Sequence, residues 1–131
     1  MIGNPVKIRR GCGFTLIELL VVMSIIGVLL TIAVPRYFRT VQRSKETVLR
    51  RDLSTLRESI DRYYGDLGQY PEALAALVDK HYIRAVPVDP FTKSTESWLI
   101  VESDDPDHPG VRDIHSGSPD SAADGSPFVS W

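Results

Sequence analysis

The stretch FTLIELLVVMSIIGVLLTIAV, residues 14–34, decides how the rest of the chain is arranged. Its 21 residues carry a single charge, Glu18. Because about 20 apolar residues in a helix span the hydrocarbon core of a bilayer, the stretch predicts a transmembrane helix. Lys7, Arg9 and Arg10 precede it, and no acidic residue occurs in the first 17 residues. This bias predicts a cytoplasmic N-terminus and a chain that continues on the other side of the membrane.

The residues around this stretch indicate a helix that is kept on the mature protein. A secretory signal has a shorter apolar core, and its small-residue cleavage site follows that core. Here the small residues Gly11 and Gly13 come first, and Pro35 follows the apolar run. Cleavage before the run would also remove Cys12, the one cysteine of the chain. The mature protein would then have no disulfide, although small exported domains often depend on them.

The start of the apolar stretch carries a specific motif. The residues Gly13-Phe14-Thr15-Leu16-Ile17-Glu18-Leu19-Leu20 resemble the cleavage and methylation motif of type IV prepilins and pseudopilins. The resemblance implies that a prepilin peptidase removes residues 1–13 and methylates the new amino group of Phe14. Pro35 also falls where this family often places a proline, at the outer end of the membrane span.

Glu18 is the candidate assembly residue. An ionisable group inside a bilayer costs at least about 2.5–3.5 kcal/mol and marks a functional site by default. Glu18 lies four residues after Phe14, on the same face of a helix. In a filament it could pair with the Phe14 amine of a neighbouring subunit and fix the axial register. The alternative is a glutamate that reaches the cytoplasmic interface with its side chain.

Helical periodicity continues beyond the membrane segment and predicts one helix from Phe14 to Tyr64, bent or opened at Pro35. Apolar residues recur at helical steps and form one stripe, interpreted as core: Val34, Phe38, Val41, Val48, Leu49, Leu53, Leu56, Ile60 and Tyr64. The opposite face is rich in arginine: Arg36, Arg39, Arg43, Arg50, Arg51, Arg57 and Arg62. Aromatic residues do not interleave with these arginines as a nucleic-acid surface would require. Contact with acidic groups of the next subunit is the favoured interpretation.

The charge balance supports that interpretation. Residues 1–62 hold 11 of the 15 basic residues and 5 of the 17 acidic ones, so the remainder of the chain is acidic. A basic stem and an acidic head suggest that like subunits stack head against stem. The alternative is that both are ordinary solvated faces.

The head is predicted to be a small α+β unit. Residues 72–80 form a short helix, and two strands follow, one within residues 96–102 and one over residues 111–115. Two prolines make residues 86–91 an extended loop, and the polar residues 104–110 form a turn. The predicted fold is pilin-like: a leader at 1–13, a transmembrane or filament-core helix at 14–35, and a head at 36–131 that includes the amphipathic half of the long helix.

The head resembles the major pseudopilin, the G subunit, of bacterial type II secretion systems. The matching residues are Gln69-Tyr70-Pro71, Leu74 and Leu77, the stretch Val86-Pro87-Val88-Asp89-Pro90, and Trp131. The chain departs from that pattern by being short between Leu77 and Tyr82 and before Trp131.

The resemblance implies a homopolymer, the pseudopilus, that drives protein secretion. It also implies minor pseudopilins, a prepilin peptidase and an inner-membrane assembly platform with a cytoplasmic ATPase as partners. The subunit would cross the inner membrane once, with its head in the periplasm.

The loop before Trp131 is a candidate calcium site. Residues 113–126 carry three aspartates and four serines among glycines, and hard oxygen ligands on a flexible loop suit calcium. The family resemblance implies Asp120, Asp124 and Ser126 as side-chain ligands, Gly117 as a carbonyl donor, and Ser116 and Asp113 as further candidates. The alternatives are a polar loop without an ion, or a site at Asp105 and Asp107.

No catalytic site is predicted. Asp113, His115 and Ser116 are the residue types of a hydrolase triad, but triads are assembled from separated segments and these residues crowd into one. A type IV pilin, a minor pseudopilin and a membrane-anchored domain that never polymerises stay open as alternatives.

Overall fold

The computed structural model describes residues 2–6 and 11–131. The basic residues Lys7, Arg9 and Arg10, which predicted the membrane orientation, lie outside the described residues. The chain falls into two compact units, one that ends at Phe38 and one that runs from Arg39 to Trp131.

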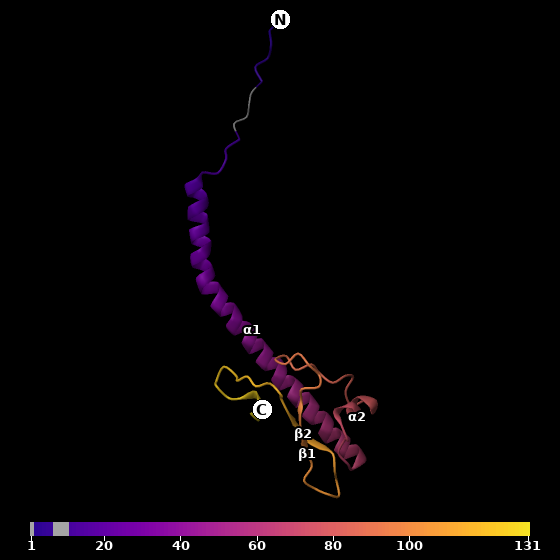
Figure 1. The fold of residues 1–131 in the computed structure, drawn as a ribbon. Helices are drawn as coiled ribbons and strands as arrows, with labels where there is room; N and C mark the ends of the chain where they lie inside the picture. Colours follow the sequence, from indigo (N-terminus) through magenta and orange to yellow (C-terminus); the bar gives the residue numbers. More distant parts are fainter. Residues whose placement is uncertain (1, 7–10) are drawn as a thin grey trace. The chain divides into compact units, whose positions relative to one another are not determined.

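The long helix α1 (Leu16–Leu67) confirms the helix predicted from the apolar stripe (Figure 1). It begins after Thr15, whose hydroxyl oxygen accepts a hydrogen bond from the N–H of Glu18 at 3.2 Å. This is the side-chain cap that a threonine provides at a helix N-terminus. Pro35 lies within α1, and the helical assignment continues through it.

The C-terminus of α1 is followed by a glycine, Gly68, that caps the helix. Gly68 has a φ of 68°, and its N–H donates to the carbonyl oxygen of Tyr64 at 2.8 Å. A glycine tolerates this left-handed conformation because it has no Cβ. α1 therefore ends three residues beyond the predicted end at Tyr64.

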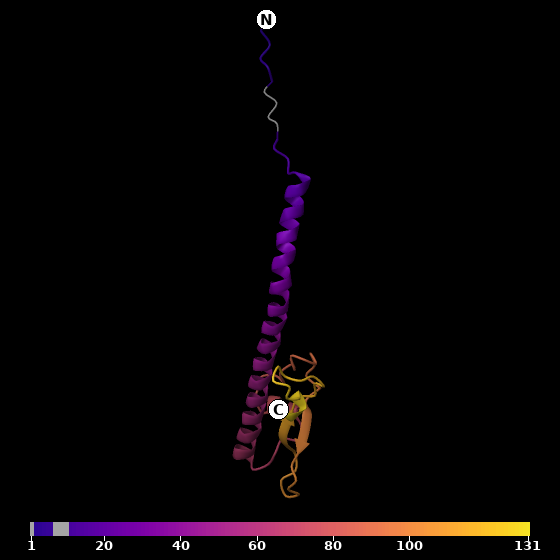
Figure 2. The same cartoon turned by 90° about the vertical axis from the view of Figure 1, so that its left-hand side faces the viewer.

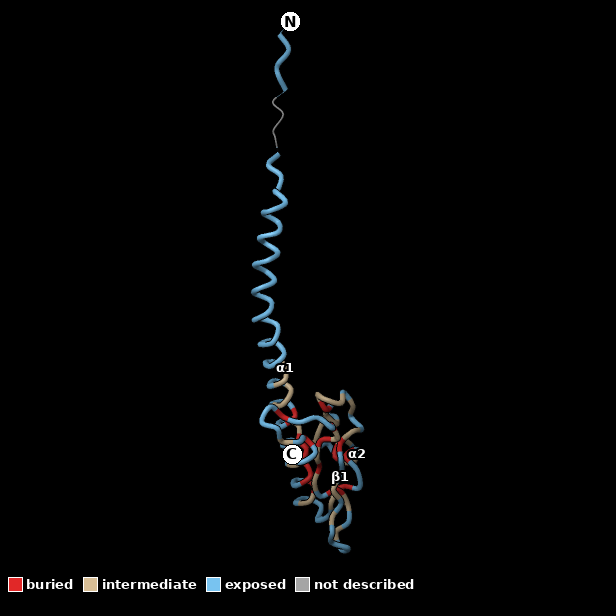
Figure 3. Tube along the Cα trace, turned by 60° about the vertical axis from the view of Figure 1, so that its left-hand side comes forward, coloured by how far each residue is buried: buried red, intermediate tan, exposed pale blue. Residues whose placement is uncertain are grey.

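The membrane part of α1 is exposed throughout the first unit. Its side chains from Leu16 to Val34 contact no core, and α1 is long and apolar enough there to cross a membrane. Figure 3 shows this part of the chain as exposed, while the buried positions lie in the second unit. The apolar surface thus needs a cover that the chain itself does not provide.

The core of the second unit forms on one face of α1. The buried side chains on that face recur at steps of three or four residues and pack against residues from later parts of the chain: Leu49, Leu53, Leu56, Ile60 and Tyr63 from α1, with Leu74, Leu77, Trp98, Val111, Ile114, Ala122 and Phe128. The predicted stripe is therefore core at Leu49, Leu53, Leu56 and Ile60. Val34, Phe38 and Val48 are exposed, and Tyr63 is buried in place of the predicted Tyr64.

The short helix α2 (Leu74–Asp79) confirms the predicted second helix, although it starts two residues later than expected. Leu74 and Leu77 are buried and hold it on the core. Residues 86–89 of the proline-rich stretch that follows belong to no helix or strand, but residues 90–92 form a turn in which the N–H of Phe91 donates to Asp89, so the predicted extended loop ends earlier than expected.

The two strands β1 (Leu99–Glu102) and β2 (Val111–His115) form an antiparallel sheet in which Leu99 pairs with His115. Figures 1 and 2 show the strands beside the C-terminal part of α1. β1 begins later than predicted. Trp98, directly before it, is buried in the core and donates its indole N–H to the main-chain oxygen of Pro87 at 2.9 Å. The fold is the α+β, pilin-like arrangement that the sequence predicts.

Candidate functional site

The predicted cleavage site lies just outside the helix. Gly13 and Phe14 are exposed and precede Leu16, the first residue of α1. The bond between them is therefore in non-helical chain, which is the form that fits a peptidase active site. Thr15 caps the helix directly after this bond.

Glu18 lies in the first turn of α1, with its side chain exposed. Its main-chain N–H is occupied by Thr15. Within the described part of the chain, no hydrogen bond or ion pair holds its carboxylate. The carboxylate is thus available to a group from outside this chain, although the structure does not test the predicted pairing with Phe14.

The C-terminal loop brings two of the predicted calcium ligands together. Asp124 Oδ1 accepts hydrogen bonds from the N–H of Ser126 at 2.9 Å and from its hydroxyl at 2.6 Å. The hydroxyl bond, and then the N–H bond, lower the pKa of Asp124. The Ser126 hydroxyl oxygen in turn accepts the indole N–H of Trp131 at 2.9 Å.

The other predicted ligands have different partners. Ser116 is buried and donates its hydroxyl to Asp89 at 2.6 Å. Gly117 approaches Ser97 so closely that a Cβ on it would overlap the main-chain oxygen of Ser97. The carbonyl oxygen of Asp120 accepts the N–H of Phe128 at 3.1 Å, while its side chain is in an exposed position.

These contacts decide how well the loop fits a calcium ion. Asp120, Asp124 and Ser126 are exposed or half-buried oxygen donors of the right chemistry. Ser116 does not fit, because it is fully buried, its hydroxyl proton is directed at Asp89, and its oxygen accepts the N–H of Ser118 at 3.2 Å. Among the residues that the structure describes, no three His, Cys, Asp or Glu side chains gather in a metal-binding group.

Arg57 is a functional residue that the sequence placed on the wrong face. The periodicity assigned it to the exposed arginine face, but its guanidinium reaches across the second unit. It donates to Asp113 Oδ1 at 2.8 Å and to the main-chain oxygens of Ile114 at 2.9 Å and Trp131 at 2.8 Å. The signal for this role is its place four residues after Leu53 and three before Ile60, two buried residues of α1 on the same side of the helix.

The three residues that resemble a hydrolase triad are only partly connected, since His115 Nε2 lies 4.0 Å from Asp113 Oδ2. Asp113 pairs with Arg57, and Ser116 bonds Asp89 rather than His115. His115 Nδ1 hydrogen-bonds the main-chain oxygen of Trp131. The Ser116 hydroxyl is therefore directed at the Asp89 carboxylate and not at His115, which is not the serine–histidine contact of a triad.

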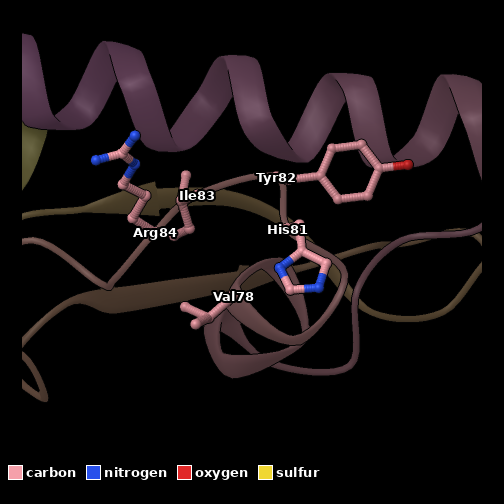
Figure 4. A pocket seen from close by; sticks show the side chains of 5 residues that line it. All are labelled: Val78, His81, Tyr82, Ile83 and Arg84. Atoms are coloured by element: carbon pink, nitrogen blue, oxygen red, sulfur yellow. The ribbon is translucent and has the colours of Figure 1, made fainter.

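A hollow near α2 is lined by Val78, His81, Tyr82, Ile83 and Arg84, with a cavity volume of about 530 Å³. Figure 4 shows Tyr82 extending along α1, while His81 points away from α1. The Tyr82 hydroxyl donates to Asp66 at 2.7 Å, and this bond raises the pKa of Tyr82. The ionisable side chains of the lining are His81, Tyr82 and Arg84, and the Tyr82 hydroxyl is already engaged by Asp66.

Comparison with known proteins connects these features. Residues 8–34 match the family model described as the prokaryotic N-terminal methylation motif. The chain is 32% identical to the type II secretion system core protein G of Dickeya chrysanthemi, over 88% of this chain and 82% of that protein. It is 33% identical to the core protein G of Pseudomonas aeruginosa, over 63% of this chain and 70% of that protein. It is also 37% identical to the fimbrial protein EcpC of Eikenella corrodens, over 58% of this chain and 53% of that protein. No solved structure matches.

Proposed function

Since the chain belongs to the family of type II secretion system core protein G, we propose that it is the major pseudopilin, the subunit that polymerises into the pseudopilus of a secretion system. The observation that carries this proposal is the apolar helix surface from Leu16 to Val34, which is exposed along its whole length. A bilayer covers such a surface before assembly, and the core of a filament covers it afterwards.

Glu18 and Phe14 would set the register of the filament. After cleavage between Gly13 and Phe14, the new N-terminus carries a positive charge within an apolar environment. A carboxylate from a neighbouring subunit offsets the cost of burying that charge. The exposure of Glu18 in the first turn of α1 supports this proposal, in which its carboxylate would make the pairing in trans.

The family also supports the location and the partners of the subunit. The helix would anchor it in the bacterial inner membrane with the head in the periplasm, and Pro35 would mark the outer end of the span. A prepilin peptidase would process it, and minor pseudopilins and a platform with a cytoplasmic ATPase would assemble it. The role is structural, without catalysis and without nucleic acid.

Calcium binding stays a prediction for the C-terminal loop. The donors that favour it are the carboxylates of Asp120 and Asp124 and the hydroxyl of Ser126, with Gly117 supplying a carbonyl. Hard oxygen donors on an exposed loop are its only support.

The fimbrial relative keeps a second candidate open, a type IV pilin subunit, and a minor pseudopilin is a third. A major pseudopilin is the bulk component of its filament, whereas a minor one is present in few copies. Quantifying this chain in purified filaments separates these cases.

The proposed function is tested by replacing Glu18 with alanine in a secreting host that has lost its own copy of this chain. We expect filament yield and cargo secretion to fall by about ten-fold or more, because the buried amine of Phe14 loses its partner. The matched control is Glu96→Ala, an exposed glutamate of the head. Normal filaments and secretion with Glu18→Ala would remove Glu18 from assembly and favour an anchored domain that never polymerises.

A further inference from the structure

We infer that the C-terminal loop of this chain is closed by a protein clamp around Trp131, so that the fold of the head does not depend on whether the loop holds a calcium ion. This inference goes beyond the proposed function. It concerns how the second unit is held together, whichever filament the chain enters.

The main chain of Trp131 is the first part of the clamp. Its carbonyl oxygen accepts Arg57 Nη2 at 2.8 Å and also bonds His115 Nδ1. Arg57 comes from α1 and His115 from β2, so one oxygen joins the end of the chain to both elements. A hydrogen bond from a charged donor is stronger than a neutral one.

The ring of Trp131 is the second part. The guanidinium of Arg50 lies over it, 4.3 Å from the ring centroid, and Phe128 meets it edge to face at 4.9 Å. Phe128 is fully buried in the core. The indole N–H donates to Ser126, which donates to Asp124. The ring thus ties the polar tip of the loop to the core.

The far side of the loop is tied to α1 independently. Glu46 Oε1 accepts the main-chain N–H of Ala123 at 2.9 Å. Ala122 donates its N–H to the carbonyl oxygen of Ser126 at 2.8 Å, which closes a tight turn. A glutamate of the stem therefore accepts a loop N–H, and a side chain of the protein takes on the anchoring role that a bound ion would otherwise have.

These contacts leave little for an ion to complete. Among the described residues, every buried side-chain nitrogen or oxygen has a hydrogen-bond partner. Asp124 Oδ1 already accepts two hydrogen bonds, and the Ser126 hydroxyl both donates and accepts. Asp124 and Ser126 are thus held by protein partners, and a calcium ion that drew on Asp124 Oδ1 would compete with these hydrogen bonds.

The test is a thermal melt of the full chain in detergent micelles, in excess EDTA and in 5 mM calcium, followed by tryptophan fluorescence. Both tryptophans, Trp98 and Trp131, lie in the second unit and report on it alone. We expect the two melting temperatures to agree within about 2 °C. Saturating calcium at a site that holds the fold would raise the midpoint by about 10 °C or more. A shift of that size would overturn the inference.

Two arginine variants examine the clamp itself. Arg57→Gln should lower the melting temperature in EDTA by about 8 °C or more, with no recovery in calcium. Arg62→Gln, an exposed arginine of the same helix that lies 3.9 Å from Glu58, should change it by less than about 2 °C. Equal melting temperatures of the two variants would contradict the clamp.

If Arg57→Gln fails to fold, the melting temperatures of the unmodified chain with and without calcium still decide the question. The melt needs no filament, so its failure is distinct from failure of the proposed function.

Discussion

Arg57 and Trp131 are 74 residues apart in the sequence, yet the Arg57 guanidinium donates to the Trp131 main-chain oxygen at 2.8 Å. The same guanidinium holds Asp113 and Ile114 of β2. One side chain on α1 thus joins the helix, the sheet and the end of the chain. Because the three acceptors lie around a planar fork of donors, the contact depends on arginine rather than on positive charge alone.

Arg57→Lys should therefore destabilise the second unit. A lysine keeps the charge but is a point donor without the planar fork, so bonds to Ile114 and Trp131 are lost. We expect a decrease of about 1–3 kcal/mol in the free energy of unfolding, measured by urea denaturation with tryptophan fluorescence. Arg62→Lys is the control. Unchanged stability of Arg57→Lys would show that charge alone is sufficient.

Asp89→Ala should destabilise the head strongly. The Asp89 side chain is fully buried and accepts the N–H groups of Phe91 at 2.8 Å and Thr92 at 3.3 Å, as well as the hydroxyl of Ser116. Removing one acceptor leaves several buried donors without a partner. The expected loss is about 2–4 kcal/mol by urea denaturation.

The control for Asp89→Ala is Asp79→Ala, an exposed position at the end of α2. A loss below about 0.5 kcal/mol for Asp89→Ala, similar to that of an ordinary surface substitution, would contradict the anchoring role of the carboxylate.

Gly117→Ala should disturb the junction between β2 and the C-terminal loop. The added methyl group would overlap the main-chain oxygen of Ser97, so one of the two backbones has to move. We expect a loss of about 1–3 kcal/mol, the usual cost of overpacking. Gly65→Ala is the matched control, because a Cβ at Gly65 in α1 meets open space. That variant should be neutral or stabilising, since alanine is the better helix former.

Acid should weaken the contact between Asp113 and Arg57. Burial alone raises the pKa of Asp113, but the N–H of Ile114 and the guanidinium of Arg57 outweigh it, and the pKa lies below its ordinary value. A carboxyl group with a lowered folded-state pKa stabilises the fold above its unfolded pKa of about 3.9. That stability is lost as the pH falls through the folded-state pKa.

The measurement for this prediction is the stability of the unmodified chain and of Asp113→Asn between pH 7 and pH 2. The difference between the two should be largest near neutral pH and should shrink below about pH 4. If the difference in stability stayed constant from pH 7 to pH 2, the charge of Asp113 would not be the source of its stabilising effect, and the prediction would be wrong.

Local sequence was sufficient for the elements that depend on neighbouring residues. Three patterns each lie within a short stretch of sequence: the apolar run from Phe14 to Val34, the spacing from Gly13 to Glu18, and the helical stripe from Leu49 to Ile60. They predicted the long helix, the membrane segment and the family. The β2 strand, Val111 to His115, was also predicted with its observed bounds.

Only the tertiary structure decided which polar side chains turn inward. Arg57 reads as one more solvated arginine, and Ser116 as one more loop hydroxyl, yet their partners lie 74 and 27 residues away in the sequence. Periodicity reports the face of an element on which a residue lies, and it carries no information about which distant groups the fold brings to that face. A charged or polar side chain is buried only where such groups satisfy it, so its role is settled by packing rather than by its neighbours in sequence.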